Sequence, residues 1–173
     1  MANSYMAEPR STKNIRDLAT NLRKVLNLEN VAKFPIIEVI ESLHIIDEDF
    51  YYEIVDKETM GNIHGLAHPN EHYIQIREDV YERCVKGYGR DRFTVAHELG
   101  HYLLHSSGVT LARLGDEKVQ AYRDPEWQAN TFAAELLMPI NLIDTNDDID
   151  EISDKFGVSI SAAKIRVKKI NMH

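Results

Sequence analysis

The 173-residue sequence has little of several residue types whose scarcity is informative. Its single cysteine, Cys84, excludes an intramolecular disulfide and a cysteine-rich metal cluster, and this is consistent with a reducing compartment. No apolar run approaches the length that spans a bilayer, and the first residues lack the apolar core of a signal peptide. We therefore expect a cytoplasmic protein that makes no contact with a membrane.

Positive charge is scarce as well. The chain has 28 acidic and 20 basic residues, which gives a formal net charge of -8. A field of this sign repels phosphate backbones, so we do not expect direct nucleic-acid binding without a local basic patch. Hydrophobic residues make up 43% and charged residues 28% of the chain, as in globular proteins, and the length suits one domain with a real core.

The pattern of apolar residues predicts helices before a small sheet in the first half of the chain. Residues 13–28 carry an apolar stripe at helical spacing, and a second helix is predicted to start at Pro35. "FYYEIV" and "HYIQI" are aromatic and β-branched, which predicts a small antiparallel sheet of two to four strands. "REDVYERCVKG" indicates a short helix closed by Gly87.

Further helices are predicted in the second half. One covers residues 92–105 with Asp91 as its cap, and the stretch to Arg123 looks mostly like loop. "DPEWQANTFAAELLMP" predicts a helix with Asp124 as N-cap. After an acidic linker, "EISDKFGVSISAAKIRVKKI" has the pattern of two helices joined by a turn. We divide the chain into an N-terminal helical segment, residues 1–30, a core, residues 31–143, and a helical appendage packed on it, residues 144–173.

The segment "AHELGH" places two histidines and a glutamate on one helix. A helix advances about 100° per residue, so His97 and His101 stand one turn apart on the same face and both imidazoles can reach one cation. Glu98 lies at the edge of that face, where its carboxylate can contact a water held by the metal. This is the geometry of the H-E-x-x-H signature, in which the glutamate is the general base.

Zinc suits two neutral imidazoles, one oxygen ligand and a fourth position left to water. The third protein ligand has to come from another helix, because Leu104 and Ser107 occupy the glycine and histidine positions of the extended motif. The alternative is a buried helix that carries histidines by chance. Glu98 argues against it, since an unpaired buried charge is strongly destabilising and a divalent metal removes that cost.

The helix that begins at Pro125 offers a third ligand. Glu126 lies in its first turn with Asn130 four residues later on the same face, so Asn130 can orient an imidazole that Glu126 joins at the metal. Glu135 falls on the opposite face and cannot share that site. Alanines at positions 129, 133 and 134 keep this helix slim, which permits close approach to the histidine helix.

The two motifs "RFTVAHELGHYLLH" and "EWQANTFAAELLMP" together resemble those of the ImmA/IrrE family of gluzincin-like metallo-endopeptidases. The resemblance covers roughly residues 36–139 and implies an α+β, zincin-like peptidase domain with a small sheet packed on the active-site helix, followed by a short C-terminal helical pair. It also implies one zinc ion per chain, held by His97, His101 and Glu126, with Glu98 as catalytic base. Asn130 stands where relatives have a group that supports a ligand histidine.

The resemblance extends to biology. Characterised relatives occur in bacteria, phages and mobile elements and cleave a helix-turn-helix repressor of the XRE-like type, usually encoded beside them, and others belong to toxin and antitoxin modules. We expect a protein substrate of this class. The residue that stabilises the oxyanion is left open, and the candidates are Tyr51, Tyr52, His64, His68, His72 and Tyr102. His105 could support the metal ligands, contact the substrate, or be a helix-end histidine near the C-terminal dipole, and we favour the last.

Two alternatives to a zinc endopeptidase remain. One is a binding module that keeps its metal for structure, and the intact Glu98 disfavours it because a structural site needs no base. The other is a DNA-binding regulator that uses the cations Lys164, Arg166, Lys168 and Lys169. We favour packing of this last helix on the core through its apolar residues. The strand "HYIQI", if it is an edge strand, could bind an extended peptide.

Overall fold

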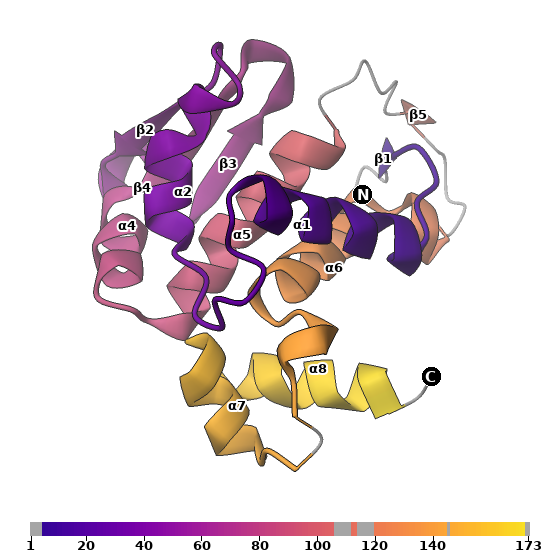
Figure 1. Ribbon diagram of the computed structural model, residues 1–173. Helices are drawn as coiled ribbons and strands as arrows, with labels where there is room; N and C mark the ends of the chain where they lie inside the picture. Colours follow the sequence, from indigo (N-terminus) through magenta and orange to yellow (C-terminus); the bar gives the residue numbers. More distant parts are fainter. Residues whose placement is uncertain (1–4, 106–111, 114–119, 145, 172–173) are drawn as a thin grey trace.

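The computed structural model describes residues 5–105, 112–113, 120–144 and 146–171. A small sheet lies at one side of a mostly helical chain, so the predicted α+β class is confirmed (Figure 1). The helices are α1 Thr12–Val25, α2 Ile36–Ser42, α3 Lys57–Met60, α4 Glu78–Val85, α5 Gly89–Leu104, α6 Pro125–Leu137, α7 Ile149–Phe156 and α8 Ile160–Asn171. The strands are β1 Tyr5–Met6, β2 Tyr51–Val55, β3 Gly65–His68, β4 Tyr73–Arg77 and β5 Ala112–Arg113, with short 3-10 turns η1 Leu43–Ile45, η2 Pro69–Glu71, η3 Ala121–Arg123 and η4 Ile140–Leu142.

The main sheet is mixed, with strand order β2-β4-β3. β3 and β4 form the expected antiparallel pair, but β2 and β4 run parallel, so the prediction of an antiparallel sheet was wrong for that pair. After β2 the chain passes through α3 to β3, which forms the opposite edge of the sheet. The β3–β4 hairpin then places β4 between β2 and β3. "HYIQI" is therefore the central strand, and β3 is an edge strand of this sheet.

Local capping explains where the main helices begin. Ser11 closes a capping box at α1, and the Asp124 side chain accepts a hydrogen bond from the Glu126 amide at α6, as its sequence predicts. Asp91, expected to cap α5, lies inside its first turn instead, and Tyr88 is the N-cap residue. Both Asp91 oxygens accept hydrogen bonds from the Arg83 guanidinium, at 2.9 and 3.0 Å, and Tyr88 makes no side-chain hydrogen bond that caps α5.

The core brings α5 and α6 together at close range. A Cβ atom on Gly100 would lie 3.0 Å from Phe132 Cδ1 and 3.2 Å from Ala129 Cα, so the two backbones approach as only small residues allow. Ala129 and Ala133 are fully buried, as expected for a slim α6. This contact sets the α5 histidines opposite the first turns of α6.

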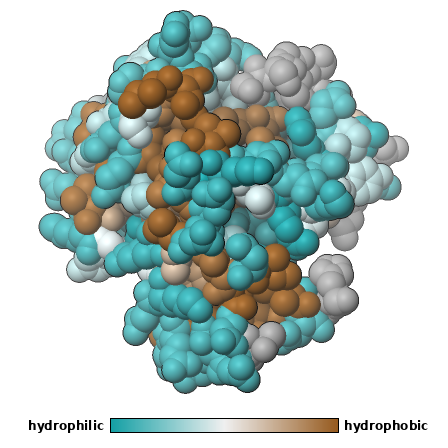
Figure 2. Space-filling model, viewed as in Figure 1, coloured by the Kyte–Doolittle hydropathy of each residue, from teal (hydrophilic) through white to brown (hydrophobic). Residues whose placement is uncertain are grey.

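The C-terminal pair α7 and α8 shares the hydrophobic core of the rest of the chain. Gly157 makes the turn between them with a φ of 62°, and Phe156 and Ala163 are fully buried. The visible surface is mostly hydrophilic, with apolar patches over α2 and near α8 (Figure 2). None of the described helices combines the length and the apolar character needed to cross a membrane.

Candidate metal centre

Three donor groups from α5 and α6 meet at one point. His97 Nε2 lies 3.0 Å from His101 Nε2, and the carboxylate of Glu126 lies 3.3 Å from the first and 3.1 Å from the second. The two imidazoles are partly buried, whereas the Glu126 side chain is 68% exposed. The expected third donor therefore reaches the histidines from the solvent side.

This donor set fits a zinc ion. Ligands about 2.0–2.1 Å from a tetrahedral zinc ion lie roughly 3.3 Å apart, and the three distances here fall within a few tenths of that value. Two imidazole nitrogens and one carboxylate oxygen also match the donor types of three-ligand zinc sites. Without a cation or an added proton, two imidazole lone pairs and a carboxylate would face one another.

Asn130 fixes the orientation and tautomer of His97. The Asn130 Oδ1 atom lies 3.0 Å from His97 Nδ1, and an amide oxygen only accepts. Nδ1 therefore carries the proton in the neutral ring, and the lone pair of Nε2 points at the other donors. Asn130 lies where the sequence predicts a supporting group.

A longer chain of hydrogen bonds, through His105 and Gln128, fixes the orientation and tautomer of His101. The Gln128 amide nitrogen donates to the backbone carbonyls of Glu8 and Tyr122, at 2.7 and 2.9 Å, so its oxygen must face His105 Nε2, 3.1 Å away. His105 Nε2 then donates, and its Nδ1 accepts from His101 Nδ1 at 3.1 Å. The lone pair of His101 Nε2 is thus also directed at the cluster.

His105 stays neutral in this chain of hydrogen bonds. Burial lowers its pKa to about 4, so the ring keeps one donor and one acceptor nitrogen at neutral pH. Both nitrogens are engaged, with His101 and Gln128. This arrangement favours a supporting role for His105 over a substrate contact.

Glu98 is buried beside the cluster, against strand β3. Gly65 makes room for it, because a Cβ atom there would lie 2.6 Å from Glu98 Cγ. Burial raises the pKa of the Glu98 carboxyl, while the nearby His97 and His101 act in the opposite direction. A carboxyl with a raised pKa is suited to taking up a proton and returning it.

The cluster shifts the pKa values of its own members. Hydrogen bonds to His101 and His97 hold the pKa of Glu126 well below its usual range. Burial lowers the pKa of His97, but the hydrogen bond to Glu126 and the charge of Glu98 outweigh it, and the net pKa is raised. Without a metal the Glu126 carboxylate therefore favours a proton on the His97 imidazole, and a cation would take the place of that proton.

Three of the candidates for stabilising the oxyanion lie in different surroundings. Tyr102 is buried, and its hydroxyl donates to Asp47 at 2.6 Å, so it is committed elsewhere. His68 stacks on Tyr73, and His72 occupies an exposed left-handed turn with a φ of 62°. None of these three is hydrogen-bonded to the metal cluster among the described residues.

Arg166, one of the cations considered for DNA contact, is buried. Its guanidinium makes two hydrogen bonds to the Glu135 carboxylate, at 2.8 and 2.7 Å, and Arg16 donates to the same carboxylate. These ion pairs hold α8 against α6 and α1. Lys164, Lys168 and Lys169 remain exposed. The preferred packing of this helix on the core is present, with a buried ion pair in addition to its apolar contacts.

Two features of the site were absent from the predictions. Gln128 is the anchor of the His101 chain, and its partners are backbone carbonyls of remote segments, which no local pattern reveals. Gly65 had only one signal, its place beside an apolar strand residue in "HGLAH", where a glycine often marks close approach by another group.

Comparison with known proteins places the chain in a family. The family model of Peptidase M78, described as the IrrE N-terminal-like domain, matches residues 63–168, more than half of the chain. The radiation response metalloprotease IrrE of Deinococcus deserti is 33% identical over an alignment of 114 positions, which covers 60% of this chain and 38% of that protein.

A solved structure shares the fold. A Mycobacterium tuberculosis transcriptional regulator superposes with a TM-score of 0.60 over 90% of this chain and 46% of the other, at 15% identity. The chain thus spans less than half the length of each of these two proteins. The ImmA/IrrE resemblance of the two motifs is confirmed, and the chain belongs to the Peptidase M78 family of IrrE N-terminal-like domains.

Proposed function

We propose that the chain is a zinc-dependent endopeptidase that hydrolyses a peptide bond in a protein substrate. The observation that carries this proposal is the convergence of His97, His101 and Glu126 beside the buried Glu98, within the segment that matches a peptidase family. The metalloprotease name of the 33% identical relative supports the same chemistry.

Each residue has a role in this proposal. His97, His101 and Glu126 hold the ion, which supplies Lewis-acid activation of a water molecule and of the peptide carbonyl. Glu98 takes the proton from the attacking water and delivers it to the leaving amine, for which its raised pKa is suited. Asn130, His105 and Gln128 keep both Nε2 lone pairs directed at the ion.

Strand β3 offers a place for the substrate backbone. Within the described part of the chain β3 pairs only with β4, and it packs against α5 next to Glu98. An extended peptide could add to this edge by main-chain hydrogen bonds, with its scissile bond near the cluster. We therefore propose β3, and not the central strand "HYIQI", as the edge that binds an extended peptide.

We further propose that the substrate is a helix-turn-helix repressor or antitoxin encoded nearby, whose cleavage relieves repression. The support is the family resemblance of the two motifs. The name of the Deinococcus relative, a radiation response protein, is compatible with a role in regulation.

A cleavage assay on the neighbouring repressor tests this function. Glu98→Gln should retain its metal and lose cleavage by about 10²–10⁴-fold, because only the proton transfer is removed. Glu82→Gln makes the same chemical change on the exposed face of α4 and should cleave like the parent. Full activity of Glu98→Gln would contradict the assigned base, and an intact repressor with the metal-loaded parent would contradict the assigned substrate.

A further inference from the structure

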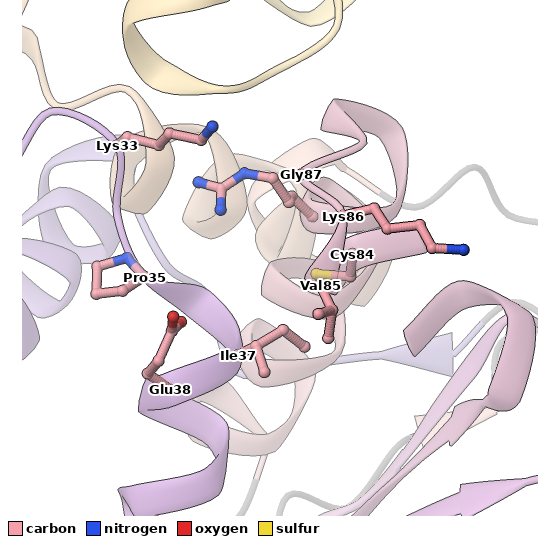
Figure 3. Close-up of a pocket in the computed structure, with 9 residues that line it drawn as sticks. Lys33, Pro35, Ile37, Glu38, Cys84, Val85, Lys86 and Gly87 are labelled. Atoms are coloured by element: carbon pink, nitrogen blue, oxygen red, sulfur yellow. The ribbon is translucent and has the colours of Figure 1, made fainter. Parts of the chain in front are cut away.

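A cavity of about 280 Å³ lies near the start of α5, between α2 and the end of α4 (Figure 3). Its volume is just below the range for small-molecule sites, roughly 300–1,000 Å³, so it suits a small ligand. Its walls carry the charged residues Lys33, Glu38, Lys86 and Arg92. We call it the Arg92 cavity.

Arg92 is a buried cation without a carboxylate partner. Its side chain is 5% exposed, and its Nε and Nη2 atoms donate to the backbone carbonyls of Gly157 and Phe34, both at 2.8 Å. Within the described ranges no acidic side chain forms a salt bridge with this guanidinium, and no hydrogen bond engages its Nη1 atom. A buried charge is costly in this state and is usually balanced by an anion.

Lys33 brings a second cation to the same place. A Cβ atom on Gly157 would lie 2.8 Å from Lys33 Cε and 3.1 Å from Arg92 Nε, so the two basic side chains flank one point. Gly157 has a φ of 62°, and its missing side chain leaves them this space. Two neighbouring cations repel each other unless negative charge lies between them.

Little negative charge faces the Arg92 cavity. Burial raises the pKa of the Cys84 thiol to about 12, so this wall is neutral at physiological pH. Figure 3 shows the Glu38 carboxylate directed into the cavity from α2 and the Lys86 ammonium group directed away from it. The inward-facing groups are therefore Lys33 and Arg92 against Glu38 alone, in a chain whose net charge is -8.

We propose that the Arg92 cavity binds a small anion, the phosphate or carboxylate group of a metabolite, between Arg92 and Lys33. Arg92 offers its Nη1 donor and the exposed Lys33 an ammonium group, which together suit an oxyanion. Arg92 precedes His97 by five residues on α5 and is tied to the turn between α7 and α8. A bound anion would thus sit where the proposed catalytic helix meets the C-terminal pair.

Calorimetric titration of the metal-loaded full chain at constant ionic strength tests the site, with inorganic phosphate and acetate as separate probes. We expect saturable binding of at least one of them. Lys33→Gln should weaken it roughly tenfold, because one charge-assisted contact is lost. Glu38→Gln should strengthen it several-fold, because the one opposing carboxylate is gone. Lys164→Gln, the same change on the exposed face of α8, should leave it unchanged.

The opposite responses of Lys33→Gln and Glu38→Gln separate this site from others. Both residues are exposed, so neither substitution should disturb folding. An ion that binds at the histidine cluster would ignore both changes, and that result would overturn the proposal. Absence of saturable binding of either probe up to tens of millimolar would overturn it as well.

Discussion

Two glutamates on α6, Glu126 and Glu135, are held in opposite ways. Glu126 is 68% exposed and faces two imidazoles whose lone pairs point at it, whereas Glu135 is 1% exposed and faces two guanidinium groups. Arg16 and Arg166 bring their own positive charge, but His97 and His101 in their neutral forms do not. The negative charge of Glu135 is therefore balanced by side chains of the folded chain. The negative charge of Glu126 is balanced only when a proton or a metal ion binds at the cluster.

This difference separates stability from function within one helix. A buried carboxylate with two arginines locks α1, α6 and α8 together, and its loss leaves uncompensated charges. An exposed carboxylate adds little to stability by itself. The same residue type thus serves the fold at one end of α6 and, we propose, the chemistry at the other.

The largest effect is expected from removing Glu135. Glu135→Ala should lower the free energy of unfolding by about 3–5 kcal/mol, because Arg166 stays buried without a partner. Glu126→Ala should change it by less than roughly 1 kcal/mol in the metal-free chain. Urea unfolding of both variants measures this, and equal losses would remove the distinction between the two glutamates.

A third glutamate, Glu98, is buried like Glu135 but lies beside the metal cluster of Glu126. Its displacement should therefore affect activity rather than metal binding. Gly65→Ala should push the Glu98 carboxylate out of position, and a displacement on the order of 1 Å can reduce activity about 10²-fold. Metal content should stay at one ion per chain. Cleavage assays with elemental analysis test this, and loss of metal would show that Gly65 supports the donors rather than the base.

A smaller effect is expected from the supporting chain behind His101. His105→Leu removes the acceptor for His101 Nδ1 and should weaken zinc binding about 10–100-fold. His105→Gln can still accept from His101 and donate to Gln128, so it should recover most of the affinity. Competition titrations with a chelator measure both variants. Equal weakening by leucine and glutamine would mean that His105 only fills space.

The smallest effect is a pH dependence of stability. Burial raises the pKa of Glu135, but the hydrogen bonds from Arg166 and Arg16 outweigh it and hold the net pKa below its ordinary value of about 4.3. Its stabilisation is thus present above that value and lost as the pH falls below it, with a slope of at most about 1.4 kcal/mol per pH unit. Urea unfolding from pH 6 to 3 should show a steeper loss for the parent than for Glu135→Gln. Identical slopes would contradict the lowered pKa.

Features set by local spacing were predictable from the sequence. The α5 donors, the Asp124 cap and the opposite faces of Glu126 and Glu135 all follow from helical periodicity, and the structure has each of them. Features set by distant partners were not. The parallel β2–β4 pair depends on how the chain crosses from one strand to the other, and the burial of Arg166 depends on Glu135, which belongs to another helix.

Zinc titration of the parent, Glu126→Gln and Glu82→Gln against a competing chelator tests the central claim most directly. The proposed site predicts one tightly bound ion in the parent and in Glu82→Gln. In Glu126→Gln, where one of three ligands is lost, affinity should fall by more than the roughly 10–100-fold typical of supporting residues. Zinc affinity in Glu126→Gln equal to that of the parent would contradict the claim that His97, His101 and Glu126 form the metal centre.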